Sequence, residues 1–430
     1  MLLLWSGQPF SAAADIDQLA ESDKRILVSV SSDEIQGDEY SGLTSPAPSW
    51  SGRYVAFMSQ ATNLVVGPQS NLADVFVRDV EAGTTQLVSL TNMDTPAYYG
   101  GSEPSISGNG RYVAFVSAMI HKGGRHDNSV YMRDRLRGTT TLISRTTRGD
   151  KAIGSVRPAV SRDGSTVVFD SRSRRLVPGD TNTRSDVFVW DADTESIRRV
   201  SVSSAGTQAL GTSHEAAVSA NGRYVAYQSN AANLDGGEAG RRDYDVFVYD
   251  RISRRTTRVS VSRDGMDGNG DSQRPSLSRN GKYVLFDSEA DNLVLGDRNS
   301  SGDVFRLNRV TGVIRRASIR SDGVEGDAGG GLAGSAMTLS GDGRYATFES
   351  SSTDLVGPGQ PFAWRNVYLH DYATKVTTRV SISPRSTSSA RYSGGATISG
   401  NGAAVTYLSK TGNQVEEDTN RREDVFLYRR

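Results

Sequence analysis

Residues 104–115 read PSISGNGRYVAF, and residues 129–134 read SVYMRD. A turn followed by a strand-like run and then by a second such run recurs seven times along the chain. The glycine of the turn falls at Gly52, Gly110, Gly164, Gly222, Gly281, Gly343 and Gly402, so successive copies lie 54 to 62 residues apart. Repeats of this length, each holding several short strands, are typical of the blades of a β-propeller.

Each copy contains four short strand-like runs. The first ends at the turn, and the second follows it, as in RYVAF at 53–57. The third resembles DVFVRD at 74–79, and the fourth ends in serine, as in QLVS at 86–89. Asn or Asp before the glycine suits a tight turn with positive φ, and Val, Phe and Tyr are favoured in buried strands. The sequence therefore predicts an all-β chain with four antiparallel strands in every blade.

The two ends of the chain predict how the ring closes. The fourth run is missing after the seventh copy, because the chain reaches Arg430 just after the third run at 424–429. An extra copy, RILVS, stands at 25–29, ahead of the first full repeat. A strand left at a blade edge would expose unpaired backbone groups. We therefore expect residues 25–29 to complete the seventh blade beside residues 424–428, in a 3+1 closure of one domain that spans 25–430.

The lengths of the connections predict two different faces. The turns between first and second strands, and between third and fourth strands, are short, whereas the other connections run to roughly a dozen residues. In an up-and-down blade the short turns share one face and the long loops share the other. Loops held on a rigid scaffold commonly carry function, so the long-loop face is the expected binding surface.

These motifs resemble the WD40-like propeller repeats of the TolB type. The matching pattern is Pro-Ser-x-Ser-x-(Asp/Asn)-Gly-Arg-Tyr-Val-Ala-Phe, then Asp-Val-Phe-x-x-Asp, then Thr-x-Arg-Val-Ser, and it extends over 25–430. The resemblance implies a propeller that is usually exported and often mediates protein–protein contact. TolB carries a separate α/β domain before its propeller, and 24 residues are too few for one, so the role of TolB in the envelope does not carry over. Similar repeats also accompany peptidase domains and oligogalacturonate lyases, so the fold alone selects no function.

Composition excludes several classes of function. The 430 residues carry 49 basic and 49 acidic side chains, which gives no net field to attract nucleic acid. There is no cysteine, hence no disulfide and no thiol nucleophile, and no apolar run is long enough to span a bilayer. Residues 1–20 begin MLLLW and contain Ala12-Ala13-Ala14, which resembles a secretory signal with its cleavage site, although a disordered tail is the alternative.

Catalytic motifs are missing from the sequence. No Gly-x-Ser-x-Gly elbow and no HExxH spacing occurs. His121 and His126 fall in a long loop of the second blade, and His370 stands where other copies have arginine and reads as a surface residue. His214, with Glu215, immediately precedes an innermost strand and so borders the channel mouth. These two residues are the candidates for binding or for catalysis.

A second polar pattern, Asp-x-Asn-x-x-x-Asp, recurs in three of the loops between second and third strands. Oxygen ligands at such spacing suit Ca²⁺, whereas the same side chains can also cap turns. Capping is favoured, because the final Asp belongs to the repeat in any case. The calcium candidates are Asp180, Asn182, Asp186, Asp297, Asn299, Asp303, Asp418, Asn420 and Asp424.

The arginine at the head of the second strand and the aspartate that closes the third recur in most copies, as with Arg53 and Asp79. Such recurrence predicts a structural ion pair, because an active site needs only one copy.

The sequence as a whole favours an exported, monomeric, non-catalytic scaffold whose long-loop face recognises a protein or a cell-wall polysaccharide, with Ca²⁺ as the one cofactor considered. The alternative is a polysaccharide-active lyase or hydrolase with its site at the channel mouth near His214.

Overall fold

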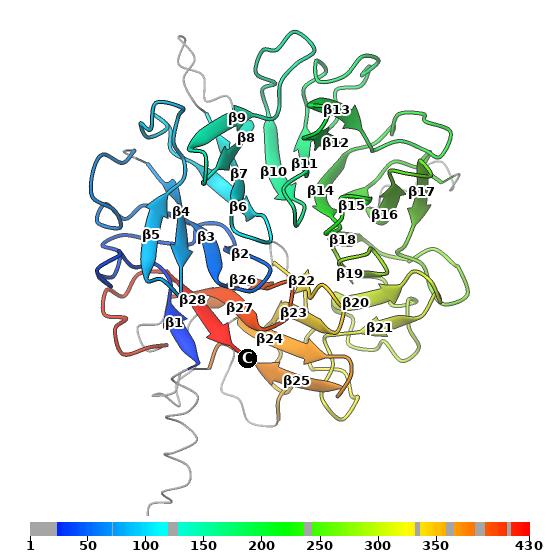
Figure 1. Cartoon of the computed structure of the whole chain (residues 1–430). Coiled ribbons are helices and arrows are strands. Elements are labelled where there is room, and N and C mark those ends of the chain that lie inside the picture. Colours follow the sequence, from blue (N-terminus) through cyan, green and yellow to red (C-terminus); the bar gives the residue numbers. More distant parts are fainter. Residues whose placement is uncertain are drawn as a thin grey trace, which may run out of the picture.

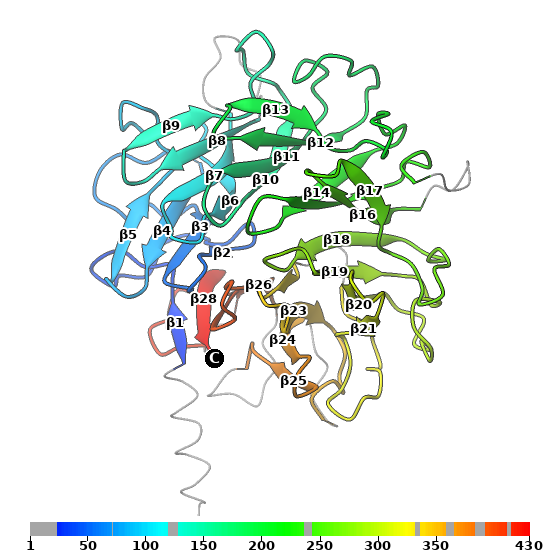
Figure 2. The same cartoon turned by 45° about the vertical axis from the view of Figure 1, so that its right-hand side comes forward.

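The computed structural model describes residues 24–70, 72–118, 128–235, 243–331, 336–357, 365–382, 392–410 and 414–430. These residues form seven four-stranded antiparallel sheets arranged as blades around one axis (Figure 1; Figure 2). The predicted seven-bladed β-propeller is therefore confirmed. Within the described ranges every element is a strand, and none is a helix that could cross a membrane.

Blade 1 comprises β2 to β5, each later blade takes the next four strands, and blade 7 comprises β26, β27, β28 and β1. The innermost strands are β2 (Ala47–Pro48), β6 (Ser102–Ile106), β10 (Ser155–Val160), β14 (Ser213–Val218), β18 (Ser272–Leu277), β22 (Thr338–Leu339) and β26 (Ser393–Ile398). The second strands are β3 (Tyr54–Ser59), β7 (Tyr112–Ser117), β11 (Thr166–Ser171), β15 (Tyr224–Ser229), β19 (Tyr283–Ser288), β23 (Tyr345–Ser350) and β27 (Ala404–Ser409). The third strands are β4 (Asp74–Asp79), β8 (Ser129–Asp134), β12 (Asp186–Asp191), β16 (Asp245–Asp250), β20 (Asp303–Asn308), β24 (Asn366–Asp371) and β28 (Asp424–Arg429). The outer strands are β5 (Thr84–Leu87), β9 (Thr139–Leu142), β13 (Ser196–Arg199), β17 (Arg255–Arg258), β21 (Ile314–Arg316), β25 (Val376–Arg379) and β1 (Arg25–Leu27).

The ring closes as the sequence predicts. Strand β1 pairs antiparallel with β28, with Arg25 opposite Tyr428 and Leu27 opposite Phe426. The contact continues past β1, because the Ser29 hydroxyl donates a 2.6 Å hydrogen bond to Asp424. Seven sheets thus form one ring in which the first and last strands of the domain share a blade.

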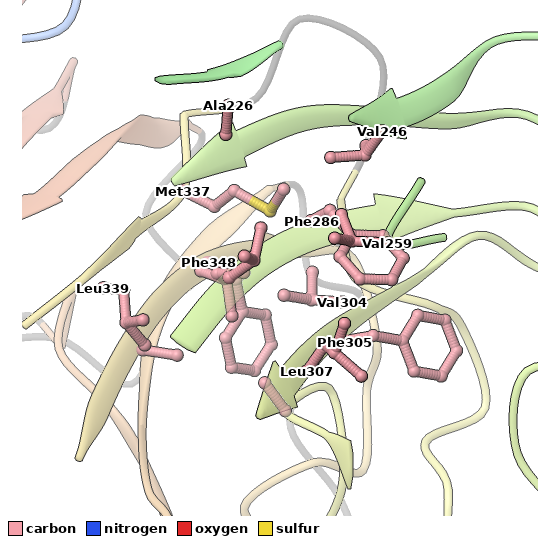
Figure 3. Packing of buried hydrophobic residues seen from close by; sticks show 14 of the residues in the cluster. Ala226, Val246, Val259, Phe286, Val304, Phe305, Leu307, Met337, Leu339 and Phe348 are labelled. Atoms are coloured by element: carbon pink, nitrogen blue, oxygen red, sulfur yellow. The ribbon is translucent and has the colours of Figure 1, made fainter. Parts of the chain in front are cut away.

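The hydrophobic core lies between neighbouring blades. In every blade an aromatic ring of the second strand packs against one of the third strand, as in Phe286 and Phe305, whose ring centroids are 6.1 Å apart. Figure 3 shows one interface, where Phe286 and Phe305 of blade 5 pack with Val246 of blade 4 and Phe348 of blade 6. Burial of such side chains stabilises the fold by about 25 cal/mol per Å² of apolar surface removed from water. The packing of one sheet face against the next is therefore the main interaction that holds the blades together.

One end of the ring, here called the short-turn end, carries the short turns. Val80, after a third strand, donates a 2.9 Å hydrogen bond to the carbonyl of Arg53, which joins the two kinds of short turn. The turn glycines have positive φ, from 67° at Gly281 to 82° at Gly164, as predicted. The predicted ion pairs are also present, between Arg53 and Asp79 and at three further blades: Arg111–Asp134, Arg223–Asp250 and Arg344–Asp371.

The opposite, long-loop end carries the long connections. Asn63, in a loop between second and third strands, donates to the carbonyl of Gln36 in the loop that leads to β2. The serine that ends an outer strand ties this end to the third strand, because Ser89 Oγ donates a 2.6 Å bond to Asp74 and accepts one from the amide of Val75. The two faces expected from loop lengths are therefore confirmed.

Candidate functional site

The innermost strands surround the axis (Figure 1), and several of them carry a bulge at their long-loop end. Four consecutive blades place a charged residue at this bulge, in the order Glu103, Arg157, Glu215 and Arg274. All four have positive φ, between 51° and 55°, which is unusual for residues with a side chain. Strained backbone of this kind is enriched at functional sites, and here it puts four side chains of alternating charge around one side of the channel.

A second set of polar side chains lies on the adjoining second strands. Asp170, Gln228, Asp287 and Glu349 occupy the same repeat position in blades 3 to 6, and each is at most 6% exposed. The other three blades carry apolar residues at that position, namely Met58, Val116 and Leu408. A polar sector in blades 3 to 6 thus faces an apolar sector in blades 7, 1 and 2. This asymmetry is a departure from the repeat, which makes the sector a candidate site.

We call this set the axial charged cluster. It consists of Glu103, Arg157, Asp170, His214, Glu215, Gln228, Arg274, Asp287 and Glu349.

Part of the cluster has a structural task, because its side chains accept hydrogen bonds from the bulges of neighbouring blades. Asp170 Oδ2 accepts a 2.8 Å bond from the amide of Glu215, and Gln228 Oε1 accepts one of the same length from the amide of Arg274. Glu349 Oε1 accepts a 2.7 Å bond from the amide of Gly395. The bulge of each of these blades is therefore held by a side chain of the preceding blade in the ring.

The cluster also has acceptor capacity that the protein does not use. Asp170 Oδ1, Asp287 Oδ1 and Glu349 Oε2 are buried and make no hydrogen bond within the described residues. Their compensating cations are Arg157, 3.4 Å from Asp170, Arg274, 2.6 Å from Asp287, and Arg365, 3.4 Å from Glu349. Buried polar atoms are normally satisfied, so these three oxygens are suited to accept hydrogen bonds from a ligand or from water.

Burial governs the protonation of the cluster. It raises the pKa of Asp170 to about 7, and the nearby guanidinium of Arg157 offsets only part of that rise. Burial likewise raises the pKa of Asp287 to about 7, against the opposing effect of Arg274. Carboxyl groups that titrate near neutrality can either donate or accept a proton, a property common in binding and catalytic sites.

His214 lies within the innermost strand β14, not before it as the sequence predicts, and its side chain belongs to the cluster. Its Nδ1 is 4.0 Å from Glu215 Oε1, and its Nε2 is 3.4 Å from Gln228 Nε2. The ring meets Tyr244 edge to face, with centroids 5.2 Å apart. Burial, together with the charges of Arg157 and Arg172, lowers the pKa of His214 to about 4, so the imidazole is neutral near pH 7. A role for His214 and Glu215 in binding stays a prediction.

Sequence reasoning missed the other seven members of the cluster, namely Glu103, Arg157, Asp170, Gln228, Arg274, Asp287 and Glu349. A signal was present, since Asp170, Asp287 and Glu349 each stand six residues after a turn glycine, where three other copies are apolar. Comparing the copies position by position would have revealed them. The bulges left no such signal, because Glu and Arg have no preference for positive φ.

The calcium candidates lie at the perimeter of the long-loop end. Each asparagine caps its own loop: the Oδ1 atoms of Asn182, Asn299 and Asn420 accept hydrogen bonds from the amide two residues ahead. Capping therefore accounts for the asparagines. In each of the three loops, a donor side chain of the protein also bridges the carboxylates of the pattern. Gln208 Nε2 contacts Asp180 and Asp186, Gln36 Nε2 contacts Asp418 and Asp424, and Arg316 contacts Asp297, Asp303 and Glu325.

The last of these groups is the densest. Ligand atoms of Asp297, Asp303 and Glu325 all lie within 4.8 Å of one another. The guanidinium of Arg316 supplies a cation to that group, 2.9 Å from Asp297 and 2.7 Å from Glu325. Calcium binding stays a prediction, and the geometry favours capping and internal ion pairing.

Of the remaining histidines, His370 falls within the described residues. His121 and His126 lie outside the described residues. The interpretation of His370 as a surface residue is wrong, because its side chain is 3% exposed and its Nδ1 lies 2.9 Å from Thr377 Oγ1. Third strands are covered by the neighbouring blade, which the local sequence around His370 does not reveal.

No protein-family model matches the sequence, and no curated protein matches it. Among solved structures, the chain resembles the oligogalacturonate lyase from Vibrio parahaemolyticus (9% identity, TM-score 0.56, covering 94% of this chain and 93% of that one). It also resembles the β-propeller domain of the Trilobed protease from Pyrococcus furiosus (11% identity, TM-score 0.53, 91% and 96% covered). A putative TolB from Agrobacterium tumefaciens matches with 14% identity and a TM-score of 0.43, over 81% and 94% of the two chains. The β-propeller fold that the TolB-type repeats imply is shared with the lyase and with the protease propeller, and identities this low show the fold alone.

Proposed function

We propose that this propeller is an exported, non-catalytic binding protein that binds a cell-wall polysaccharide at the long-loop end of its channel, in the sector of blades 2 to 6. The observation that carries the proposal is the axial charged cluster. It interrupts the repeat on one side of the ring, and it holds buried carboxylate oxygens that accept no hydrogen bond from the described residues.

The chemistry of the cluster suits a ligand rich in hydroxyl groups. Glu103, Arg157, Glu215 and Arg274 alternate acceptor and donor side chains along neighbouring blades. A polysaccharide presents hydroxyls that both donate and accept, so it can bridge such an alternating row. Ligand sites of this kind commonly combine a few convergent polar groups with aromatic surface, which Tyr244 supplies beside His214.

Binding can be measured by isothermal titration calorimetry with soluble oligosaccharides of plant and bacterial cell walls, both charged and uncharged. The variant Glu215→Gln keeps the size of the side chain and removes its charge. We expect it to weaken binding about tenfold, as for the loss of one charge-assisted hydrogen bond. The control Glu81→Gln makes the same change at the short-turn end and should bind as the wild type does. Equal affinities for all three proteins, or no binding by any of them, would refute the proposal.

The second candidate is a polysaccharide-active enzyme, which one observation favours. His214 is a neutral, half-buried imidazole whose Nδ1 makes no hydrogen bond within the described residues, and Glu215, whose amide donates to Asp170, lies beside it. A positioned neutral histidine can act as a general base. Incubation with the same oligosaccharides separates the two functions. New reducing ends or new C=C absorbance, lost in His214→Ala, would establish the enzyme and overturn the non-catalytic proposal.

Export and oligomeric state are separate parts of the proposal. Residues 1–20 support export through their resemblance to a signal segment. Mass spectrometry of the mature N-terminus after expression of the full chain tests this, because export predicts cleavage near Ala14. Light scattering should give a monomer mass of about 46 kDa, or slightly less after cleavage.

A further inference from the structure

The seven turns at the short-turn end form a closed ring of backbone hydrogen bonds. The residue after the turn serine donates its amide hydrogen to the equivalent carbonyl of the next blade, as Gly108 does to Arg162. At the last step Asn401 donates to Trp50, and the seven distances run from 2.8 to 3.2 Å. The residues of the ring are Trp50, Gly108, Arg162, Ala220, Arg279, Gly341 and Gly400. Apart from the last step the backbone contacts are equivalent, so these positions differ mainly in their side chains.

Trp50 lies across the mouth of the channel that this ring encloses. A methyl group on Gly400 would come within 2.1 Å of the Trp50 ring, and one on Gly341 within 2.3 Å. The indole, which belongs to blade 1, therefore rests on the backbone of blades 6 and 7. The glycines of those blades leave the space that the indole occupies.

Two arginines complete the mouth. The guanidinium carbon of Arg162 lies 4.2 Å from the centroid of the Trp50 ring, and that of Arg279 lies 5.8 Å from it. Both side chains are exposed, and neither forms an ion pair or a side-chain hydrogen bond within the described residues. Arg111, on the same face, is paired with Asp134 at 2.6 Å, so unpaired arginines are not a general property of this end.

The pocket around these arginines offers mainly donors. Trp50, Asn109, Arg162, Asn221 and Arg279 line it. The Oδ1 atoms of Asn109 and Asn221 already accept bonds from the amides of Arg111 and Arg223, so the side-chain NH₂ groups remain as donors.

One acidic residue, Asp163, also lines this pocket. Its Oδ1 already accepts hydrogen bonds from Ser161 Oγ at 2.6 Å and from the amide of Ser165 at 3.0 Å. The two guanidiniums therefore outnumber the single carboxylate, and that carboxylate is held by its own turn.

We propose that the short-turn mouth is an oxyanion-binding site in which Arg162 and Arg279, steadied by the indole of Trp50, hold a carboxylate or phosphate group. Guanidinium groups bind both kinds of oxyanion through parallel N–H donors. Contact with an aromatic face limits the motion of the arginine side chain without using its donors. The site lies at the opposite end of the ring from the axial charged cluster and does not depend on the proposed function.

The test is isothermal titration calorimetry of the full chain with inorganic phosphate and, separately, with succinate. We expect saturable binding of at least one anion, and the anion bound identifies the source of the oxyanion. The double variant Arg162→Ala/Arg279→Ala keeps the backbone ring intact and should bind at least about tenfold more weakly. Tryptophan fluorescence provides a second readout, since Trp50 contacts both arginines.

The matched control is Arg198→Ala/Arg255→Ala, which removes two exposed arginines from outer strands β13 and β17. It should bind as tightly as the wild type, and both variants should retain the wild-type melting temperature. If both double variants bound the anion equally weakly, the loss of affinity would be explained by the change in net charge, and the proposal would be overturned. Failure of the wild type to bind either anion would overturn it as well. Polysaccharide binding by Arg162→Ala/Arg279→Ala should be unchanged, which separates this site from the proposed function.

Discussion

The two ends of the same seven innermost strands are built on different principles. At the short-turn end every blade contributes the same backbone bond to a ring, and the charges that recur are paired with each other at the surface. At the long-loop end the side chains differ from blade to blade, and carboxylates such as Asp170 and Asp287 are buried. The contrast teaches that in a repeat protein the shared residues build the frame, whereas positions that break the repeat are the candidates for ligand binding.

The largest expected effect comes from breaking the ring on which both ends depend. Deletion of residues 1–29 removes β1 and leaves the edge of β28 unpaired. We expect the protein to lose cooperative unfolding or to melt at a much lower temperature, because every blade is held by its neighbours. Deletion of 1–22 leaves β1 intact and should melt as the full chain does. If calorimetry gives the same melting temperature for both truncations, closure through β1 does not stabilise the ring.

A buried charge at the long-loop end should cost more to unpair than an exposed charge at the short-turn end. Arg274→Met leaves the carboxylate of Asp287, which is 6% exposed, without its cation. We expect a loss of about 3 kcal/mol in the free energy of unfolding, against less than about 0.5 kcal/mol for Arg162→Ala. The double variant Arg274→Met/Asp287→Leu should recover most of the loss in urea unfolding. Equal costs for the two single variants would contradict the contrast between the ends.

The two ends should also respond to pH in different ranges. At the long-loop end the folded-state pKa of Asp287, about 7, lies above its ordinary value. Its contribution to stability is therefore full below about pH 4 and is lost as the pH rises through 7. The folded-state pKa of His214, about 4, lies below its ordinary value, so its contribution is full above about pH 6.5 and is lost as the pH falls through 4. At the short-turn end Arg53 holds the pKa of Asp79 below its ordinary value, so that contribution is lost only under acid conditions.

Single variants separate these opposing contributions. Between pH 4 and 7, Asp287→Asn should make the free energy of unfolding rise more steeply with pH than in the wild type. His214→Gln should make it rise less steeply. Chemical unfolding at several pH values measures both slopes. A change of slope with the same sign in the two variants would contradict the assigned directions.

The exposed ion pairs of the short-turn end should have a smaller effect. Arg111→Ala breaks the pair with Asp134 and should cost at most about 1 kcal/mol, less in high salt. Blade 5 allows the reverse test, because it has Lys282 and Asn308 where blade 2 has Arg111 and Asp134. Lys282→Arg with Asn308→Asp installs the pair and should raise the free energy of unfolding by about 0.5 kcal/mol. If thermal unfolding gave a much larger increase in the free energy of unfolding, the exposed ion pairs of the short-turn end would be a major source of stability, which would contradict the contrast between the ends.

The sequence predicts the frame better than the site, and the reason is physical. Blade number, closure by residues 25–29, the two faces and the Arg53–Asp79 type of pair all recur, so each is supported by several copies. The bulge at Glu215 and the burial of His370 depend on contacts with the neighbouring blade, which the local sequence does not encode. Trp50 stands at a repeat position where other copies have glycine, alanine or arginine, and its significance follows only from the ring that brings those positions together.

The smallest effect is expected for calcium, which the recurring Asp-x-Asn-x-x-x-Asp pattern suits. Around Asp297, Asp303 and Glu325 the cation is already Arg316, so millimolar Ca²⁺ should leave the melting temperature of the wild type unchanged. Arg316→Gln removes that cation, and the three carboxylates then repel one another at ligand distance. We expect this variant to be less stable and Ca²⁺ to restore part of its melting temperature, because oxygen ligands at this spacing suit the ion. Magnesium, which demands a stricter octahedral geometry, should restore less. A shift of the wild-type melting temperature by Ca²⁺, reversed by EDTA, would instead make the perimeter of the long-loop end a metal-binding surface, and the contrast between the two ends would then include a bound ion.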